Sequence, residues 1–211
     1  MIEESPCTAL SDKLRKKMGA TAVRAAKAVG YENAGTIEFL LDKSGEFYFM
    51  EMNTRIQVEH PVSEFVSGVD LVKEQIRVAA GERLSVQQKD IELKGHAIEC
   101  RINAEDPDHN FMPCPGTITS LHLPGGNGVR MDTAVYAGYT IPPYYDSMIV
   151  KVIVYDRDRE SAIRKMISTL GEVVIEGVKT NIDFQYDLLN QPDFQSGNIT
   201  TDFIPQHYEN M

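Results

Sequence analysis

The sequence has no long apolar run. None of its apolar stretches approaches the roughly 20 residues that span a bilayer, and its N-terminus has no apolar signal core. It is also poor in cysteine, with three in 211 residues and no Cys-x-x-Cys pair. An odd number of isolated cysteines argues against a disulfide scaffold and against a zinc knuckle. We therefore expect a cytoplasmic protein.

Positive charge is scarce and scattered. The 31 acidic residues outnumber the 21 basic ones, for a formal net charge of −10. The longest basic run, residues 13–17, lies within a predicted helix and is interpreted as its solvated face. This balance argues against nonspecific binding to nucleic acids or to anionic membranes.

The length suits one large domain or two small ones. A polar, mixed stretch at residues 84–95 predicts a boundary, which gives domains at 1–94 and 95–211. Strands and helices alternate without regular βαβ order, so the predicted class is α+β. The predicted elements are a helix from after Thr8 to Gly30, strands at 35–41 and 47–52, helical segments from 61 to 80 broken near Gly68 with Asp70 as N-cap, strands at 97–103, 117–123, 129–132 and 148–155, a helix at 158–170, a strand at 173–176, and a helix at 180–190 that Pro192 ends.

Two glutamates are predicted to face each other across the hairpin formed by the first two strands. With residues 43–46 as the loop, Glu38 pairs with Glu51 and Leu40 pairs with Phe49. Like charges directly across a strand pair are destabilising, and a hard cation such as Mg²⁺ would relieve the repulsion. The alternative is a register in which one glutamate faces solvent.

Polar side chains also alternate after the hairpin. Asn53 continues the carboxylate face and adds a neutral oxygen ligand. Arg55, Gln57 and Glu59 would share one side of an extended segment. Arg55 can hold a small oxyanion through two hydrogen bonds, Gln57 can donate another, and Glu59 can accept a proton. This pattern predicts activation of a small anion with ATP; the alternative is an exposed loop with an Arg–Glu ion pair.

Several segments together resemble the biotin carboxylase family of ATP-grasp enzymes. The resemblance covers essentially the whole chain, and its longest segment contains the residues discussed above. The matching segments are 47–62 (FYFMEMNTRIQVEHPV), 68–72 (GVDLV), 100–107 (CRINAEDP), 136–139 (YAGY), 142–148 (PPYYDSM) and 177–181 (GVKTN).

The resemblance implies an enzyme that phosphorylates bicarbonate with ATP, giving carboxyphosphate, and then carboxylates N1′ of biotin on a carrier protein. It implies that residues 1–94 are the C-terminal part of an ATP-grasp domain. Residues 95–211 are then a biotin carboxylase C-terminal domain, an antiparallel sheet with helices. The implied cofactors are ATP and Mg²⁺ or Mn²⁺.

The family's metal and nucleotide contacts map onto the hairpin. By resemblance, Glu38, Glu51 and Asn53 are ligands of the metal ions that bridge the nucleotide phosphates, and Glu38 and Glu51 count among the nucleotide contacts. Leu40 matches an apolar position against the adenine ring. Its alternative interpretation is a simple core leucine.

The residues implied in the chemistry follow the hairpin and continue into the second half. Arg55, Gln57 and the backbone of Val58 resemble the bicarbonate pocket, and Glu59 resembles the general base. Arg101 matches the residue that stabilises the biotin enolate and orients carboxyphosphate. On its predicted strand Arg101 alternates with apolar residues, so we expect it to point away from the core.

Other chemistry-bearing residues are assigned structural roles. His60 and Glu64 are four residues apart but have no third ligand nearby, so a zinc site is not expected. His96 and Cys100 are interpreted as strand residues. The glycine-rich segment 124–128 lacks the helix start or GK[ST] ending of a phosphate loop and predicts a tight turn.

The resemblance also implies partners and a longer protein. Arg130 matches a position at the family's homodimer interface. The implied partners are a biotin carboxyl carrier protein and carboxyltransferase subunits, as in bacterial acetyl-CoA carboxylase. Because the glycine-rich lid and N-terminal domain of the family are not in this sequence, we expect the isolated chain to be inactive, at most a dimerising or partner-binding module. Alternatives are the biotin carboxylase part of another acyl-CoA or pyruvate carboxylase, and another ATP-grasp ligase such as a carbamoyl-phosphate synthetase.

Overall fold

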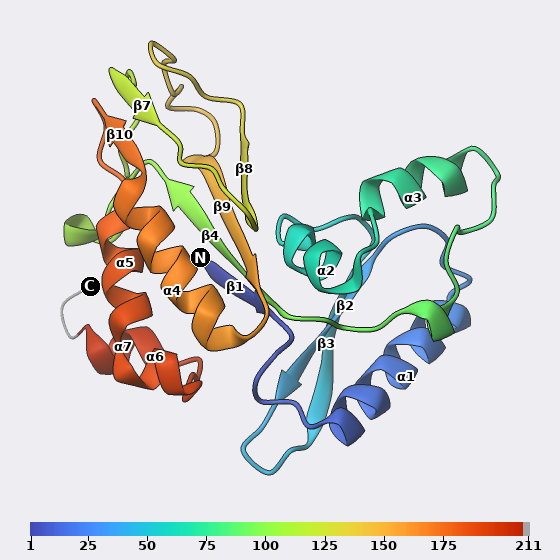
Figure 1. The fold of residues 1–211 in the computed structure, drawn as a ribbon. Helices are drawn as coiled ribbons and strands as arrows, with labels where there is room; N and C mark the ends of the chain where they lie inside the picture. Colours follow the sequence, from blue (N-terminus) through green and yellow to red (C-terminus); the bar gives the residue numbers. More distant parts are fainter. Residues whose placement is uncertain (209–211) are drawn as a thin grey trace. The chain divides into compact units, whose positions relative to one another are not determined.

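The computed structural model describes residues 1–208 as an α+β protein built of two compact units (Figure 1). The hairpin unit is Pro6–Leu93, and the sheet unit combines Met1–Ser5 with the chain from Lys94 onward. The first five residues, which the sequence assigns to the domain at 1–94, thus belong with the second half. Within residues 1–208, no helix has the length and apolar character needed to cross a membrane.

The hairpin unit contains one two-stranded sheet and three α-helices, as the sequence predicts. Helix α1 is shorter than expected, because Ser11 rather than Thr8 caps it by accepting a hydrogen bond from the Leu14 N–H. Its predicted apolar face has little to pack against, so none of its residues is buried and Val29 is 70% exposed. The elements are α1 (Asp12–Ala28), β2 (Thr36–Leu41), β3 (Phe47–Asn53), α2 (His60–Ser67), α3 (Leu71–Ala79) and the 3₁₀ turn η1 (Gln88–Asp90).

The break between α2 and α3 is confirmed where the sequence places it. Gly68 adopts a left-handed conformation with φ 72° at the end of α2, which glycine tolerates without steric cost. Asp70 caps α3 by accepting the Lys73 N–H at 2.8 Å. Both signals are local, which explains why sequence reasoning finds them.

The sheet unit is organised around a four-stranded antiparallel sheet in the order β1-β4-β9-β8. Strand β1, which the sequence analysis does not anticipate, pairs with β4 from Ile2 opposite Cys100 to Ser5 opposite Ala97. Helices α4 and α5 pack on the sheet and bury its apolar side chains, such as Ile98 and Ile102 (Figure 1). The strands of this sheet are β1 (Ile2–Ser5), β4 (His96–Asn103), β8 (Val129–Thr133) and β9 (Met148–Asp156).

The remaining elements of the sheet unit include one confirmed helix end and one correction. The helix predicted at 180–190 ends at Asn190, just before Pro192, as expected; Pro192 also begins α6, because proline is tolerated in the first turn. The strand predicted at 117–123 is reduced to β7, since the residues before it bond irregularly to Tyr139 and Glu176. These elements are η2 (Pro107–His109), α4 (Arg159–Glu172), α5 (Ile182–Asn190), α6 (Pro192–Ser196), α7 (Phe203–His207) and the paired short strands β5 (Glu105–Asp106) with β6 (Met112–Pro113) and β7 (Ser120–His122) with β10 (Val174–Glu176).

A largely buried ionic network fastens β1 to β4 and α4. The Glu4 carboxylate accepts a hydrogen bond from Arg159 Nε at 2.7 Å, and its Oε2 lies 2.8 Å from His96 Nε2. Arg159 also donates to the backbone carbonyls of Phe194 and Gln195. Burial raises the pKa of Glu4, but the hydrogen bonds from His96 and Arg159 outweigh it and hold that pKa below its ordinary value.

Replacing Glu4 by Gln should lower the free energy of unfolding of the sheet unit by about 3 kcal/mol, because a buried guanidinium loses its counter-charge. Since the pKa of Glu4 is lower in the folded than in the unfolded state, its contribution is present above about pH 4.3 and is lost as the pH falls through the folded pKa. Thermal unfolding followed by circular dichroism should show a deficit at neutral pH that shrinks in acid. Glu160→Gln, at an exposed pair with Arg164, is the control; equal losses in both variants would contradict the assignment.

Candidate functional site

The hairpin unit brings two carboxylates and one amide together on one face of the sheet. Glu38 lies directly opposite Glu51, as predicted, and Asn53 continues the same face of β3. Asn53 Nδ2 donates to Glu38 Oε1 at 2.8 Å and to Glu51 Oε1 at 2.9 Å. We call Glu38, Glu51 and Asn53 the carboxylate cluster.

A β-bulge creates this juxtaposition. The predicted pairing of Leu40 with Phe49 is wrong, because Leu40 lies opposite Tyr48, and the register shifts by one residue between Phe39 and Glu38. Met50 is the extra residue on β3; without it, Glu38 would face Met50 instead of Glu51. Bulges are common beside functional sites because they re-aim side chains.

The cluster's negative charge is compensated by neutral donors. Glu38 Oε1 also accepts a hydrogen bond from Gln57 Nε2 at 2.7 Å, and within residues 1–208 neither glutamate forms an ion pair with a Lys or Arg. No group of three or more His, Cys, Asp or Glu side chains suited to a metal occurs in the described part of the chain. A cation here would therefore have two carboxylates, the Asn53 amide oxygen and outside ligands. Mg²⁺ bound beside a phosphate has this kind of ligand set.

The segment after β3 departs from the extended conformation that the sequence predicts. It turns before α2, with the His60 N–H bonded to the Gln57 carbonyl, so a turn rather than strand alternation places Glu59. The turn is needed because α2 begins at His60 with Pro61 in its first turn. Glu59 is the half-buried residue that precedes the helix, next to half-buried Val58.

Arg55 and Leu40 are both accessible. Arg55 Nη2 donates to Asn53 Oδ1 at 3.4 Å and Nη1 donates to the Ile56 carbonyl at 3.2 Å, long bonds that leave its side chain exposed. Leu40 shares the face of β2 with Glu38 and is 55% exposed, so it is not a core leucine. An apolar surface and a cationic fork thus lie on the same unit as the carboxylate cluster.

Arg101 lies in the sheet unit, on the central strand β4. Its alternation with apolar residues is as predicted, but its side of the strand is not a solvated face: Glu99, on the same side, is 0% exposed and the Arg101 side chain only 28%. Side chains of the two neighbouring strands flank this face, with Glu3 of β1 opposite Glu99 and Lys151 of β9 opposite Arg101. The Arg101 guanidinium pairs with Glu3 on β1 at 2.9 Å, a partner that no local pattern in the sequence indicates.

The remaining sequence candidates have structural partners. Glu64 Oε1 accepts the Leu71 N–H at 2.8 Å at the start of α3. His96 and Cys100 are buried on β4, as expected. Segment 124–128 contains a tight turn closed by a hydrogen bond from Val129 to Gly126. Arg130 forms a two-pronged ion pair with Asp132, both bonds 2.8 Å long.

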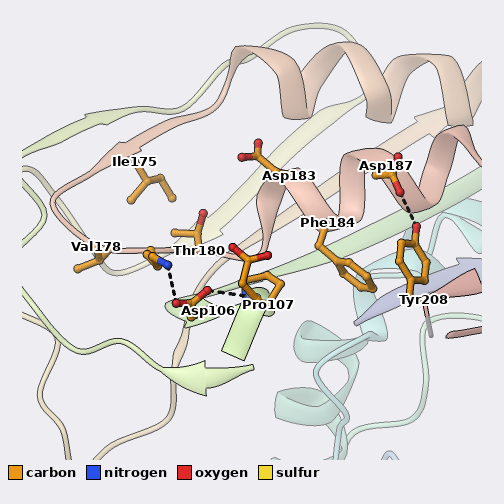
Figure 2. Close-up of a pocket in the computed structure, with 11 residues that line it drawn as sticks. Asp106, Pro107, Ile175, Val178, Thr180, Asp183, Phe184, Asp187 and Tyr208 are labelled. Carbon is orange, nitrogen blue, oxygen red and sulfur yellow. Dashed lines mark hydrogen bonds and ion pairs between the residues drawn. The ribbon is translucent and has the colours of Figure 1, made fainter. Parts of the chain in front are cut away.

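The sheet unit also contains an acidic cavity of about 520 Å³ that the sequence analysis does not anticipate (Figure 2). Burial and a hydrogen bond to Asp187 raise the pKa of Tyr208, on its wall, to about 12. None of the predicted site residues lines it, and its carboxylates would repel a nucleotide's phosphates. The carboxylates are Asp106, Asp108, Asp183 and Asp187.

Comparison with known families divides the chain in two. Residues 99–206 match the family model of the biotin carboxylase C-terminal domain. Residues 1–87 match the family model of the ATP-binding domain of the carbamoyl-phosphate synthase L chain.

Individual proteins match the whole chain. It is 58% identical over 205 residues to biotin carboxylase 1 of Bacillus subtilis, covering 97% of this chain and 46% of that protein. It is 55% identical over 207 residues to a pyruvate carboxylase subunit of Methanothermobacter thermautotrophicus, covering 98% and 42%. A solved dimer of the biotin carboxylase domain of Hydrogenobacter thermophilus 2-oxoglutarate carboxylase, in complex with MgADP, ADP and bicarbonate, superposes with a TM-score of 0.96 at 49% identity, covering 98% of this chain and 46% of that one. The chain therefore spans less than half the length of these relatives.

Proposed function

The chain belongs to the biotin carboxylase family, and from this we propose that it serves the ATP-dependent carboxylation of carrier-bound biotin with bicarbonate, by way of carboxyphosphate. The observation that carries the proposal is the carboxylate cluster, where a bulge aligns two glutamates whose hydrogen-bond donors, among residues 1–208, are neutral amides. The match of residues 99–206 to the biotin carboxylase C-terminal domain favours this reaction over that of a carbamoyl-phosphate synthetase.

In this proposal Glu38, Glu51 and Asn53 hold Mg²⁺ or Mn²⁺, and ATP is the phosphoryl donor. When bound, the metal neutralises charge on the nucleotide phosphates during phosphoryl transfer. Asn53 can present its Oδ1 to the metal after rotation of its amide group. The exposed Leu40 on the same strand face supplies an apolar contact for the adenine ring.

The residues after the hairpin are assigned to bicarbonate. Arg55 holds the anion through its guanidinium, with Gln57 and the Val58 backbone as further donors. A cation is needed because the neighbouring carboxylates would otherwise repel bicarbonate. Glu59 removes the bicarbonate proton, so that the resulting dianion can attack the γ-phosphate of ATP.

Arg101 is assigned to the second step, in which its guanidinium stabilises the negative charge that develops on the biotin ureido group. The proposed partners are a biotin carboxyl carrier protein, carboxyltransferase subunits and a second copy of the enzyme, with Arg130 at the homodimer interface. We favour acetyl-CoA as the final acceptor and fatty acid synthesis as the role, although the chain is also similar to a pyruvate carboxylase subunit.

The proposal is tested with a chimera in which this chain replaces the matching part of the Bacillus subtilis relative. The chimera should hydrolyse ATP in a bicarbonate-dependent manner and carboxylate free biotin, whereas the isolated chain should do neither. Release of ADP and formation of carboxybiotin are measured with and without bicarbonate. A folded chimera that forms no carboxybiotin would contradict the proposed function, and turnover by the isolated chain would contradict the expectation that it is inactive alone.

A further inference from the structure

The segment 177–181, which the proposed reaction leaves without a role, contacts β4 at Arg101. The Asn181 side chain bridges two backbone groups of that strand: its Nδ2 donates to the Arg101 carbonyl at 3.1 Å, and its Oδ1 accepts the Asn103 N–H at 2.9 Å. The Asn181 N–H donates to the Asn103 carbonyl at 3.2 Å. Gln185, one turn into α5, adds a hydrogen bond from Nε2 to the Arg101 carbonyl at 2.7 Å.

These bonds stand in for a missing strand partner. The pairing of β1 with β4 stops at Cys100, and the Arg101 N–H makes the last bond on that edge, to the Met1 carbonyl. On the other edge, the β4–β9 register shifts between Ile102 and Asn103. The pairing with β9 is regular at Arg101 and shifts only after Ile102, whereas the pairing with β1 ends beside Arg101. The Arg101 carbonyl therefore accepts side-chain hydrogen bonds from Asn181 and Gln185 in place of a strand partner.

Segment 177–181 is itself held firmly. Lys179 pairs with Asp106 at 2.5 Å, and Figure 2 shows Asp106 facing the segment between Val178 and Thr180. Gly177 has φ +96° and packs so closely that a Cβ there would lie 2.2 Å from the Thr117 carbonyl oxygen. A segment fixed in this way can hold the backbone groups that it contacts in one position.

Asn181 and Gln185 are 1% and 0% exposed, so their amides are shielded from competition with water. Glu3 holds the other end of Arg101 through an ion pair of 2.9 Å to its guanidinium. The Arg101 backbone and guanidinium are therefore restrained separately. Restraint at both ends fixes the position of the guanidinium. This position matters most where the guanidinium stabilises a negative charge that develops during the reaction.

We propose that Asn181, assisted by Gln185, is a positioning residue for Arg101 in the carboxylation of biotin. The inference rests on the proposed function, since it assigns Asn181 to the same step as Arg101. Asn181 does not contact the substrate; it acts by fixing the β4 backbone from which the guanidinium projects.

The test is a double-mutant cycle in the chimera, with carboxylation of free biotin as the readout. Asn181→Ala should lower kcat by about tenfold or more, because a displacement of about 1 Å in a positioned group can cost about a hundredfold. The KM for ATP should not change. In an Arg101→Ala background the same substitution should cause no further loss, since there is no guanidinium left to position.

Two further variants complete the experiment. Gln185→Met, of similar volume, should cause a smaller loss of kcat that also depends on the presence of Arg101. This variant replaces Asn181→Ala in the cycle if Asn181→Ala does not fold. Asn190→Ala, on the exposed end of α5 where the side chain bonds only to the Tyr186 carbonyl, should leave kcat unchanged. Equal losses with and without Arg101 would overturn the inference alone, whereas a folded wild-type chimera without carboxybiotin would overturn the proposed function as well.

Discussion

Glu59→Gln in the chimera is expected to abolish bicarbonate-dependent ATP hydrolysis. Glutamine keeps the size and hydrogen-bonding reach of glutamate, but its amide cannot take the proton of bicarbonate. Positioned general bases contribute about 10²–10⁴-fold, so the loss should be of that order. The turn between Gln57 and His60 fixes the backbone of Glu59 before α2, and an isosteric change should leave that turn intact.

The measurement is the initial rate of ADP release with and without bicarbonate, together with carboxybiotin formation. Glu82→Gln, the same substitution at an exposed position of the hairpin unit, should retain the wild-type rate. Wild-type bicarbonate dependence in Glu59→Gln would show that another group removes the proton. The assignment of Glu59 would then fall while the family assignment stands.

The sequence predicts the pairing of the two hairpin glutamates because the signals for it are close together in the chain. Strand period, loop and carboxylate spacing lie within residues 35–59, and the Glu38–Glu51 pair is confirmed by the register. The bulge at Met50 is not predictable, because an extra residue on one strand has no distinct signature in a run of apolar residues. The predicted register is correct beyond the bulge and wrong between the bulge and the loop.

The surroundings of Arg101 could not be predicted, because they come from both ends of the chain. Glu3 lies on a strand of four residues whose partner begins almost a hundred positions later, and so short a segment shows no useful alternation. Asn181 and Gln185, from α5 and the segment before it, donate to the Arg101 carbonyl. Motif matching identifies Arg101 and Asn181 separately, but only the fold joins them.

Helix boundaries show the same division between local and distant information. Asp70 and Gly68 act on their own neighbours, and both predictions are confirmed. The helix predicted to end before Pro192 does end at Asn190, and the same fixed φ also suits the start of a further helix, α6, which the sequence analysis does not predict. Local chemistry marks the position of the break but not the helix that begins there.

Glu51→Gln is expected to have opposite effects on stability and on activity. Glu51 faces Glu38 directly, and a like-charge pair across a strand costs about 0.2–1 kcal/mol. Glutamine removes the repulsion while its carbonyl can still accept the Asn53 hydrogen bond. The hairpin of the isolated chain should therefore become more stable by up to about 1 kcal/mol, seen as slower amide hydrogen exchange in residues 36–41.

The same substitution in the chimera should lower ATP hydrolysis about a hundredfold or more, because a metal ligand contributes several kcal/mol to stabilising the transition state. Half-maximal activity should also require a higher Mg²⁺ concentration. Glu46→Gln, on the exposed hairpin loop, should change neither property. If the variant gains stability and keeps wild-type activity, Glu51 is not a metal ligand. Loss of both stability and activity would mean that the glutamate pair has a structural role. A cation site predicts opposed effects, because the repulsion between the two glutamates is relieved only when the metal is bound.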